Sequence, residues 1–250
     1  MITTVLFDMG GTLEDIWVDE QSEALAVRTL SAMLKNWGLD AGEDLAALKA
    51  RVDAGWAQYA RIRDEDNVER KPVSIWCDYA LCSPLYPRRA LAPHAEEIAH
   101  MWEITHYHRK LRPRVPEMLE GLQELGLKMG VVSNTAALFQ VFSSLEAYGI
   151  RGYFRDVTLS SVTGIRKPDA DIFTVALRQV RSEPCECVYV GDTVSRDVIG
   201  AKRAGFAAAI QICSKLTREK DASVQGAMEA DYQISDIYDV YNVVKGLISR

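Results

Sequence analysis

Short apolar runs recur along the chain, each followed by a loop and an amphipathic segment of helical length. Five runs have the length and composition of buried β-strands: residues 4–7, 128–132, 156–159, 188–190 and 207–212. The segments with helical spacing of apolar residues are 115–125, 136–148, 170–180, 196–204 and 237–248. This alternation predicts an α/β fold, a doubly wound, Rossmann-like parallel sheet with helices on both faces.

Residues 14–114 interrupt this alternation, because no convincing strand pattern occurs among them. They contain three stretches of helical pattern: 20–37, 44–63 and 93–109. Pro113 and Pro116 disfavour continued helix and mark the return to the α/β pattern. We therefore expect residues 1–13 and about 115–250 to form a catalytic core, with residues 14–114 inserted as an α-helical cap domain.

The composition is that of an ordinary globular protein, with 48% hydrophobic and 26% charged residues among 250. No stretch approaches the roughly 18 apolar residues of a membrane span, and the first residues lack the pattern of a secretory signal, so we expect a cytoplasmic protein. A net charge of −6 does not favour binding to nucleic acid. A small-molecule substrate fits better, and we expect a monomer or a homodimer.

The chain has an odd number of cysteines, without the paired Cys-x-x-Cys spacing of a zinc site. They are Cys77, Cys82, Cys185, Cys187 and Cys213. We expect buried free thiols.

Polar side chains gather where the predicted strands end, which is where open parallel sheets bind their ligands. These positions carry three carboxylates, one ammonium group and small hydroxyl or amide donors: Asp8, Ser133, Asn134, Lys167, Asp192 and Asp197. A site that handles an anionic group is the chemistry that this set indicates.

Asp8 stands at the end of the first strand and is followed closely by glycines. Because nothing bulky flanks it, a phosphorus atom can approach its carboxylate, and the backbone N–H groups of Gly11 and Thr12 are available for phosphate oxygens. Asp8 is therefore a candidate covalent nucleophile.

Two carboxylates repel a phosphate dianion unless cations intervene. Mg²⁺ bound by Asp8, Asp192 and a backbone carbonyl would supply positive charge, and Lys167 would neutralise the rest. Ser133 and Asn134 offer neutral donors for the phosphoryl oxygens, which stabilises a charge-rich transition state.

The four motifs, in this order and with a helical insertion after the first, resemble the haloacid dehalogenase-like hydrolase superfamily over the whole chain. Residues 8–12 look like the first motif, Ser133 the second, Lys167 the third, and Asp192 with Asp197 in a supporting role the fourth. The resemblance implies that the first-motif aspartate is phosphorylated and then hydrolysed, that Mg²⁺ bridges nucleophile and phosphate, and that the cap opens and closes over substrate.

One position departs from the family pattern. Phosphatases of the family usually place a second aspartate two residues after the nucleophile, where it protonates the leaving group and later activates water, but this sequence has Gly10. Positioned acid/base catalysis contributes ~10²–10⁴ in rate, so we expect weak phosphomonoesterase activity unless another group substitutes. The Gly10 carbonyl remains a predicted metal ligand, because a carbonyl needs no side chain.

Three explanations for this glycine stay open. A cap residue or the substrate supplies the proton, with Glu14, Asp15 or a cap histidine as candidates. Alternatively, the chemistry resembles the family's phosphonatases, which need a cap lysine such as Lys35 or Lys49, or its dehalogenases, against which Asp192 argues. In the third explanation the chain is a slow or inactive relative that binds a phosphorylated ligand or a protein partner.

The cap also concentrates histidine and tryptophan. All the histidines fall within fifteen residues of one another on the last predicted cap helix: His94, His100, His106 and His108. His-x-His on a helix points its side chains apart, and no acidic or thiol pattern completes a site, so metal binding is disfavoured. We expect these histidines to form a solvated face with some core packing. Contact with an anionic substrate is the alternative. The tryptophans are expected in the cap core: Trp17, Trp37, Trp56, Trp76 and Trp102.

The sequence thus favours a Mg²⁺-dependent hydrolase that acts on a small phosphorylated metabolite through an aspartyl-phosphate on Asp8. A non-catalytic ligand- or partner-binding protein of the same fold is the alternative from another class. A phosphonatase-like or dehalogenase-like hydrolase is the next alternative among enzymes.

Overall fold

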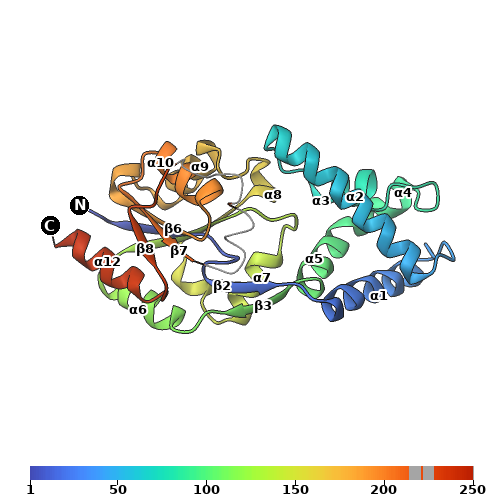
Figure 1. Ribbon diagram of the computed structural model, residues 1–250, viewed down its shortest axis with the longest axis horizontal. Helices are drawn as coiled ribbons and strands as arrows, with labels where there is room; N and C mark the ends of the chain where they lie inside the picture. The colour runs from blue at the N-terminus through green and yellow to red at the C-terminus, as the bar shows by residue number, and fades with distance from the viewer. Residues whose placement is uncertain (214–220, 222–227, 250) are drawn as a thin grey trace.

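The computed structural model describes residues 1–213, 221 and 228–249. The molecule is elongated, with a sheet-containing core at one end and a group of helices at the other (Figure 1). Among the described residues, no helix is both long enough and apolar enough to cross a membrane.

A six-stranded, all-parallel sheet forms the centre of the core. Its strands are β1 (Thr4–Phe7), β4 (Lys128–Ser133), β5 (Asp156–Leu159), β6 (Cys187–Gly191), β7 (Ala208–Ile212) and β8 (Tyr232–Ile234). Their order is β5-β4-β1-β6-β7-β8, and every neighbouring pair is parallel. The five predicted strands are confirmed to within one residue at each end. The prediction missed β8, whose three residues make no distinct apolar run.

Helices cover both faces of this sheet, as predicted. One face carries α6 (Val115–Glu124), α7 (Gln140–Ala147) and α12 (Asp239–Ile248), and the other carries α9 (Ala170–Val180) and α10 (Ile199–Arg203) (Figure 1). Successive side chains of a strand point to opposite faces. Val5 and Phe7 of β1 therefore join the hydrophobic cluster beneath α6, α7 and α12, and Leu6 joins the cluster beneath α9 and α10. The doubly wound α/β fold is therefore confirmed.

Two core helices differ from the prediction. The helix expected from residue 136 begins only at Gln140, because the Thr135 hydroxyl accepts a hydrogen bond from the Ala137 N–H (3.3 Å) and offers the backbone an alternative to helix. The helix expected at 196–204 is divided into a π-helical turn, η5 (Val194–Val198), and α10. The short elements of the core are α8 (Ser160–Thr163), η3 (Arg151–Tyr153) and η4 (Pro184–Glu186).

The inserted segment is mainly helical. Its helices and turns are α1 (Glu20–Asn36), α2 (Leu45–Asp66), α3 (Pro72–Ser74), η1 (Ile75–Ala80), α4 (Arg88–Leu91), η2 (Ala92–His94) and α5 (Ala95–Thr105). Asp19 and Asp44 begin α1 and α2 by accepting backbone hydrogen bonds at the N-caps. These helices share a hydrophobic cluster of their own around Trp76 and Tyr59, which supports the proposed division into core and cap.

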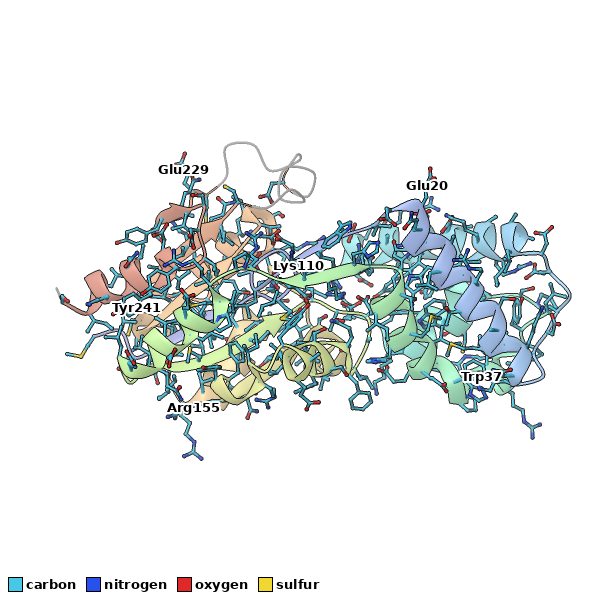
Figure 2. The ribbon with its side chains drawn as sticks, turned by 90° about the horizontal axis from the view of Figure 1, so that it is seen from below. Glu20, Trp37, Lys110, Arg155, Glu229 and Tyr241 are labelled. Carbon is cyan, nitrogen blue, oxygen red and sulfur yellow. The ribbon has the colours of Figure 1, made fainter. Side chains whose placement is uncertain are left out.

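The expectation that residues 14–114 hold no strand is wrong. β2 (Glu14–Trp17) pairs antiparallel with β3 (His108–Leu111), and this two-stranded ribbon connects core and cap. Figure 2 shows Lys110 of the ribbon between Tyr241 in the core and Trp37 in the cap. The strands escaped prediction because each has only four residues and no apolar run: two residues of β2 and three of β3 are charged or polar. The predicted helix at 93–109 ends at Thr105.

The tryptophan and cysteine predictions are partly confirmed. Trp76 and Trp102 are buried in the cap cluster and Trp37 and Trp56 pack against it, but Trp17 is 42% exposed on β2. All cysteines are free, as expected. Burial is confirmed for Cys77 and Cys187 and is wrong for the other three, which are exposed: Cys82, Cys185 and Cys213.

Candidate active site

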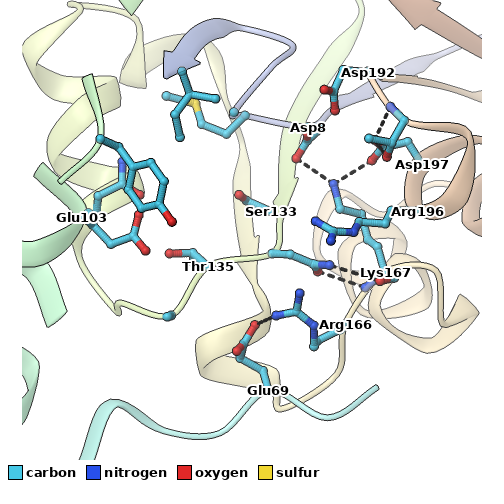
Figure 3. Close-up of a pocket in the computed structure, with 18 of the residues that line it drawn as sticks. Asp8, Glu69, Glu103, Ser133, Thr135, Arg166, Lys167, Asp192, Arg196 and Asp197 are labelled. Atoms are coloured by element: carbon cyan, nitrogen blue, oxygen red, sulfur yellow. Dashed lines mark hydrogen bonds and ion pairs between the residues drawn. The ribbon is translucent and has the colours of Figure 1, made fainter. Parts of the chain in front are cut away.

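A cavity of about 390 Å³ lies where the core sheet faces the inserted helices. Asp8, Lys167 and Asp192 line it from the core, and Glu103 lines it from the cap (Figure 3). Arg63 of the cap also lines it. Its size is that of a site for a small metabolite.

The register of the parallel strands brings the predicted residues to this cavity. Phe7 of β1 lies opposite Val131 of β4 and Val190 of β6, so the residues that follow these strands emerge side by side. Asp8 and Asp192 follow β1 and β6 directly, and Ser133 is the last residue of β4. All three are buried and line the cavity.

Lys167 is the centre of a buried polar network. Its Nζ donates to Oδ1 of Asp8 (2.6 Å), to Oδ1 of Asp197 (2.7 Å) and to the hydroxyl of Tyr189 (3.1 Å). The Asn134 side chain accepts from the Lys167 N–H (2.9 Å) and donates to the Lys167 carbonyl (3.1 Å). Asn134 thus positions the lysine backbone, while its predicted contact with phosphate stays a prediction.

The electrostatics keep this network charged. Burial alone would lower the pKa of Lys167, but the carboxylates of Asp197 and Asp8 outweigh burial and raise it above the ordinary value. Burial alone would raise the pKa of Asp197, but the ammonium of Lys167 and hydrogen bonds from Thr193 lower it. Lys167 is therefore cationic and Asp197 anionic at neutral pH.

Three carboxylates meet closely enough to bind one cation. Oxygens of Asp8, Asp192 and Asp197 all lie within 4.8 Å of one another. Both oxygens of Asp197 accept hydrogen bonds within the protein, Oδ1 from Lys167 and Oδ2 from the N–H (3.0 Å) and hydroxyl (2.7 Å) of Thr193. Asp197 therefore supports the lysine, and binding of a hard divalent cation by Asp8 and Asp192 stays a prediction with which this proximity is compatible.

Gly11 is required by the same arrangement. Its φ is +94°, and a Cβ on it would lie 2.7 Å from Cγ of Asp192, so a larger residue would displace that carboxylate. However, the Gly11 N–H donates to the Glu14 carbonyl (2.8 Å) and the Thr12 N–H to the Met9 carbonyl (3.2 Å). Neither Gly11 nor Thr12 is among the cavity-lining residues, so their contact with phosphate stays a prediction that this geometry does not support.

Gly10, by contrast, lines the cavity and has open space beside it. A Cβ there would lie 3.8 Å from Cγ2 of Ile16 and 3.9 Å from Oε1 of Glu14, both ordinary contacts. Glu14 is fully buried, bound by the Arg109 guanidinium and by the Tyr148 hydroxyl (2.8 Å). Its carboxylate lies near the position of the missing aspartate but is already held by two partners.

The other candidate acids and the cap lysines lie outside the cavity lining. Asp15 is 54% exposed and pairs with Arg112 (3.1 Å), and Lys49 pairs with Glu23 and with Asp53. Among the described residues that line the cavity, Lys167 is the only lysine and no histidine occurs. The Schiff-base and histidine alternatives therefore find no support in this arrangement. Two carboxyl groups of the cap, those of Glu69 and Glu103, do line it. Burial raises the pKa of Glu103, although the positive charge of Arg109 opposes this shift.

The histidines are dispersed over several elements, so the prediction that they share one helix is wrong. Only His100 lies within α5, and His94, His106 and His108 stack on Trp37, Trp102 and Trp17, respectively. In the described part of the chain, the acidic trio above is the only group arranged to hold a metal ion. Three of the four histidines therefore pack against tryptophan rings.

Several cavity residues were not predicted from sequence. The charged members of this set are Glu69, Glu103 and the arginines Arg63, Arg109, Arg166 and Arg196. Glu69 pairs with Arg166. Arg166 and Arg196 each stand directly before a predicted site residue, which is the one sequence signal that pointed to them. Arg63 and Glu69 come from the insertion, where the pattern of the sequence does not indicate which side chains face the core.

Comparison with known proteins places these motifs in a family. Residues 2–205 match the family model for haloacid dehalogenase-like hydrolases. The 2-haloacid dehalogenase from Pseudomonas syringae pv. Tomato DC3000 has the same fold, with a TM-score of 0.72 over 99% of this chain and 100% of that one, at 23% identity.

Several curated relatives carry the name glyceraldehyde 3-phosphate phosphatase, among them the following two. The protein from Methanopyrus kandleri is 40% identical over 94 residues, which are 38% of this chain and 40% of the relative. The protein from Methanocaldococcus jannaschii is 31% identical over 150 residues, 58% of this chain and 63% of the relative. The matches span less than two thirds of either relative. Since the family model covers most of the sequence and its four motifs meet at one cavity, the chain belongs to the haloacid dehalogenase-like hydrolases.

Proposed function

We propose that this protein is a Mg²⁺-dependent phosphatase that hydrolyses a small phosphorylated metabolite through an aspartyl-phosphate on Asp8. The observation that carries the proposal is the placement of Asp8 beside both an ammonium group at 2.6 Å and the Asp192 carboxylate, within one cavity. The names of the two archaeal relatives support a phosphorylated three-carbon or similar substrate.

In the proposed reaction a carboxylate oxygen of Asp8 attacks phosphorus. The bond from phosphorus to the ester oxygen breaks, and the alcohol leaves with a proton. Lys167 fixes Oδ1 of Asp8 and so orients the nucleophile, while the hydroxyl of Ser133 lies on the cavity wall to donate to a phosphoryl oxygen. Water then attacks phosphorus, which releases inorganic phosphate and restores the Asp8 carboxylate.

Asp8, Asp192 and the carbonyl of Gly10 are the residues proposed to hold Mg²⁺. Two adjacent carboxylates repel each other and the phosphate, and a bound divalent cation would supply the positive charge that offsets this repulsion. Asp197 acts one step away, because its oxygens hold Lys167 and Thr193 in place.

This chain has no acidic side chain at position 10, where related phosphatases usually place the proton donor. Gly10 leaves a space, Glu14 is held by Arg109 and Tyr148, and Glu103 faces the cavity with a raised pKa. We therefore propose slow turnover of ordinary esters. A non-catalytic role stays the alternative, and the monomeric or dimeric state and the cytoplasmic location stay predictions.

A phosphate-release assay tests the proposal. Purified protein with Mg²⁺ is given p-nitrophenyl phosphate and glyceraldehyde 3-phosphate, and Asp8→Asn is compared with Asp171→Asn, which removes an exposed carboxylate from α9 of the core. We expect Asp8→Asn to lower kcat by about 10³-fold or more, chelation of Mg²⁺ to abolish release, and Asp171→Asn to match the unaltered protein.

A second readout examines the intermediate. Protein quenched in acid during turnover is expected to carry one phosphoryl group on Asp8, detected by intact mass and peptide mapping. Equal phosphate release by the unaltered protein and Asp8→Asn would refute the proposed nucleophile.

A further inference from the structure

Four arginines line the cavity. Arg109 pairs with Glu14 and Glu103, and the proposed reaction uses none of the other three. Arg63 comes from α2 of the cap, Arg166 from the loop before Lys167, and Arg196 from η5. Figure 3 shows the guanidinium groups of Arg166 and Arg196 pointing into the pocket on the side of Lys167 opposite to Asp192. We call Arg63, Arg166 and Arg196 the arginine cluster.

Arg166 is the fixed member of the cluster. Its guanidinium pairs with Glu69, and both side chains are buried. Glu69 also accepts hydrogen bonds from the hydroxyls of Tyr59 and Ser160, the latter at 2.8 Å. The Asn67 amide donates to the Arg166 carbonyl (3.0 Å), so core and cap together hold this arginine in position.

The other two arginines have little opposing charge inside the cavity. Arg63 pairs at 2.9 Å with Asp64, whose side chain is 64% exposed and therefore strongly hydrated. Within the part of the chain that the structure describes, Arg196 forms no ion pair, although it is only partly exposed. The cluster thus presents three positive charges against one buried carboxylate.

The effect of this imbalance is visible at Arg166. Burial, followed by the positive charges of Arg63 and Arg196, lowers the pKa of Arg166 to about 9, even though Glu69 is its ion-pair partner. The guanidinium groups repel one another in a partly dehydrated space. An additional anion in the cavity would relieve that repulsion.

We propose that the arginine cluster is a subsite for a second anionic group, a phosphate or a carboxylate, on the same small phosphomonoester whose first phosphate reacts at Asp8. This inference rests on the proposed function and narrows it to substrates with an anion at both ends. Planar guanidinium groups bind the oxygens of either anion in pairs, which suits them to this role. Because Arg63 belongs to the cap, the subsite is complete only when cap and core face each other.

Pairs of phosphomonoesters that differ in one group test the subsite. 3-Phosphoglycerate is compared with glycerol 3-phosphate, and fructose 1,6-bisphosphate with fructose 6-phosphate, so the two pairs separate a carboxylate from a phosphate. In the unaltered protein we expect kcat/KM for at least one doubly anionic compound to exceed that of its partner by about 10-fold or more. Equal values within both pairs would overturn the proposal.

Two variants connect that preference to the cluster. Arg196→Gln and Arg63→Gln are each expected to reduce the preference within the pair by about 10-fold, toward equal kcat/KM, which is the effect of losing one charge-assisted contact. Arg89→Gln, which removes an exposed cap arginine outside the cavity lining, is expected to leave the preference unchanged. Arg166 is not substituted, because its loss would leave Glu69 buried without a cation. An equal loss for both members of a pair would refute a subsite.

Binding to Asp8→Asn separates failure of the subsite from failure of the proposed function. Calorimetric titration with the same compounds measures affinity without turnover. If Asp8→Asn binds the doubly anionic compound more tightly than its partner, and Asp8→Asn/Arg196→Gln loses this preference, the subsite is supported. Absence of phosphate release by the unaltered protein would then refute only the phosphatase activity. Equal affinity within both pairs, or an unchanged preference in the double variant, would overturn the subsite. Circular dichroism of each variant checks folding.

Discussion

Single residues at the end of β1 decide what chemistry the site can perform. Asp8 and Gly10 stand two positions apart, and both line the cavity. Only the first carries a functional side chain, so the nucleophile is present where the usual acid is absent.

Replacement of Gly10 by aspartate is expected to raise phosphatase kcat by about 10-fold or more, since positioned acid/base catalysis contributes ~10²–10⁴. The new side chain has room, because a Cβ at this position meets Ile16 and Glu14 only at 3.8 and 3.9 Å. Steady-state phosphate release from p-nitrophenyl phosphate measures the change.

Gly10→Asn is the matched control, because it has the same shape and cannot transfer the proton. We expect it to show no gain. If Gly10→Asp and Gly10→Asn turn over equally, the missing acid is not what limits the rate.

At the residue scale the sequence was informative wherever a polar residue follows a strand. Asp8, Ser133, Lys167 and Asp192 were all predicted, and all line one cavity. Gly11 was predicted for phosphate binding, yet its N–H is bonded to Glu14 and its conformation instead makes room for the Asp192 carboxylate. The partner of a backbone N–H depends on tertiary geometry, which the motif alone does not contain.

At the scale of elements, the β2–β3 ribbon is the feature that joins core and cap. Arg109 of β3 binds Glu14 of β2 and also Glu103 of α5 (2.6 Å), while the Tyr148 hydroxyl bonds Glu14 from the end of α7. One buried guanidinium thus connects both strands with a cap helix.

Arg109→Met is expected to lower the free energy of unfolding by about 3–5 kcal/mol, because it leaves the fully buried Glu14 without its cation. Urea unfolding followed by tryptophan fluorescence measures the loss. The double variant Glu14→Gln/Arg109→Met is expected to recover part of it, since the uncompensated charge is gone.

Arg88→Gln provides the control, because it breaks an exposed ion pair between Arg88 of α4 and Asp78 of η1. Its unfolding curve should coincide with that of the unaltered protein. If Arg88→Gln lowered the free energy of unfolding as much as Arg109→Met does, a special role for the Glu14–Arg109 ion pair would be contradicted.

Elements with a clear apolar pattern were predictable and those without one were not. α9 agrees with its prediction at both ends, since Asp169 caps it and five apolar residues face the sheet. β2, β3 and β8 were missed because, unlike the equally short β1 and β5, they contain no distinct apolar run. Their conformation depends on a partner strand that is distant in sequence or on the edge of an existing sheet.

At the scale of the whole molecule, two separate hydrophobic regions bury different side chains. Cys77 lies in the cap cluster and Cys187 in the core, whereas the remaining thiols are exposed. Burial raises the pKa of Cys187 to about 12 and also raises that of Cys77.

We therefore expect three fast-reacting thiols in the native protein with 5,5′-dithiobis(2-nitrobenzoate) at pH 8, and all five after denaturation. Thiols titrate as thiolates, so a raised pKa and burial both slow Cys77 and Cys187. Peptide mapping after brief alkylation identifies the sites. Fast labelling of either buried cysteine would contradict this packing.

The sequence by itself determined the doubly wound core and the residues that follow β1, β4 and β6. Periodicity and strand-end chemistry are local properties, so they can be detected without coordinates. Only the tertiary structure decided which insertion residues face Asp8, because a helix with charges on several sides does not indicate its orientation. The pairing of Arg166 with Glu69, across 97 residues, and the placement of Arg63 in the same cavity arise from the packing of cap against core.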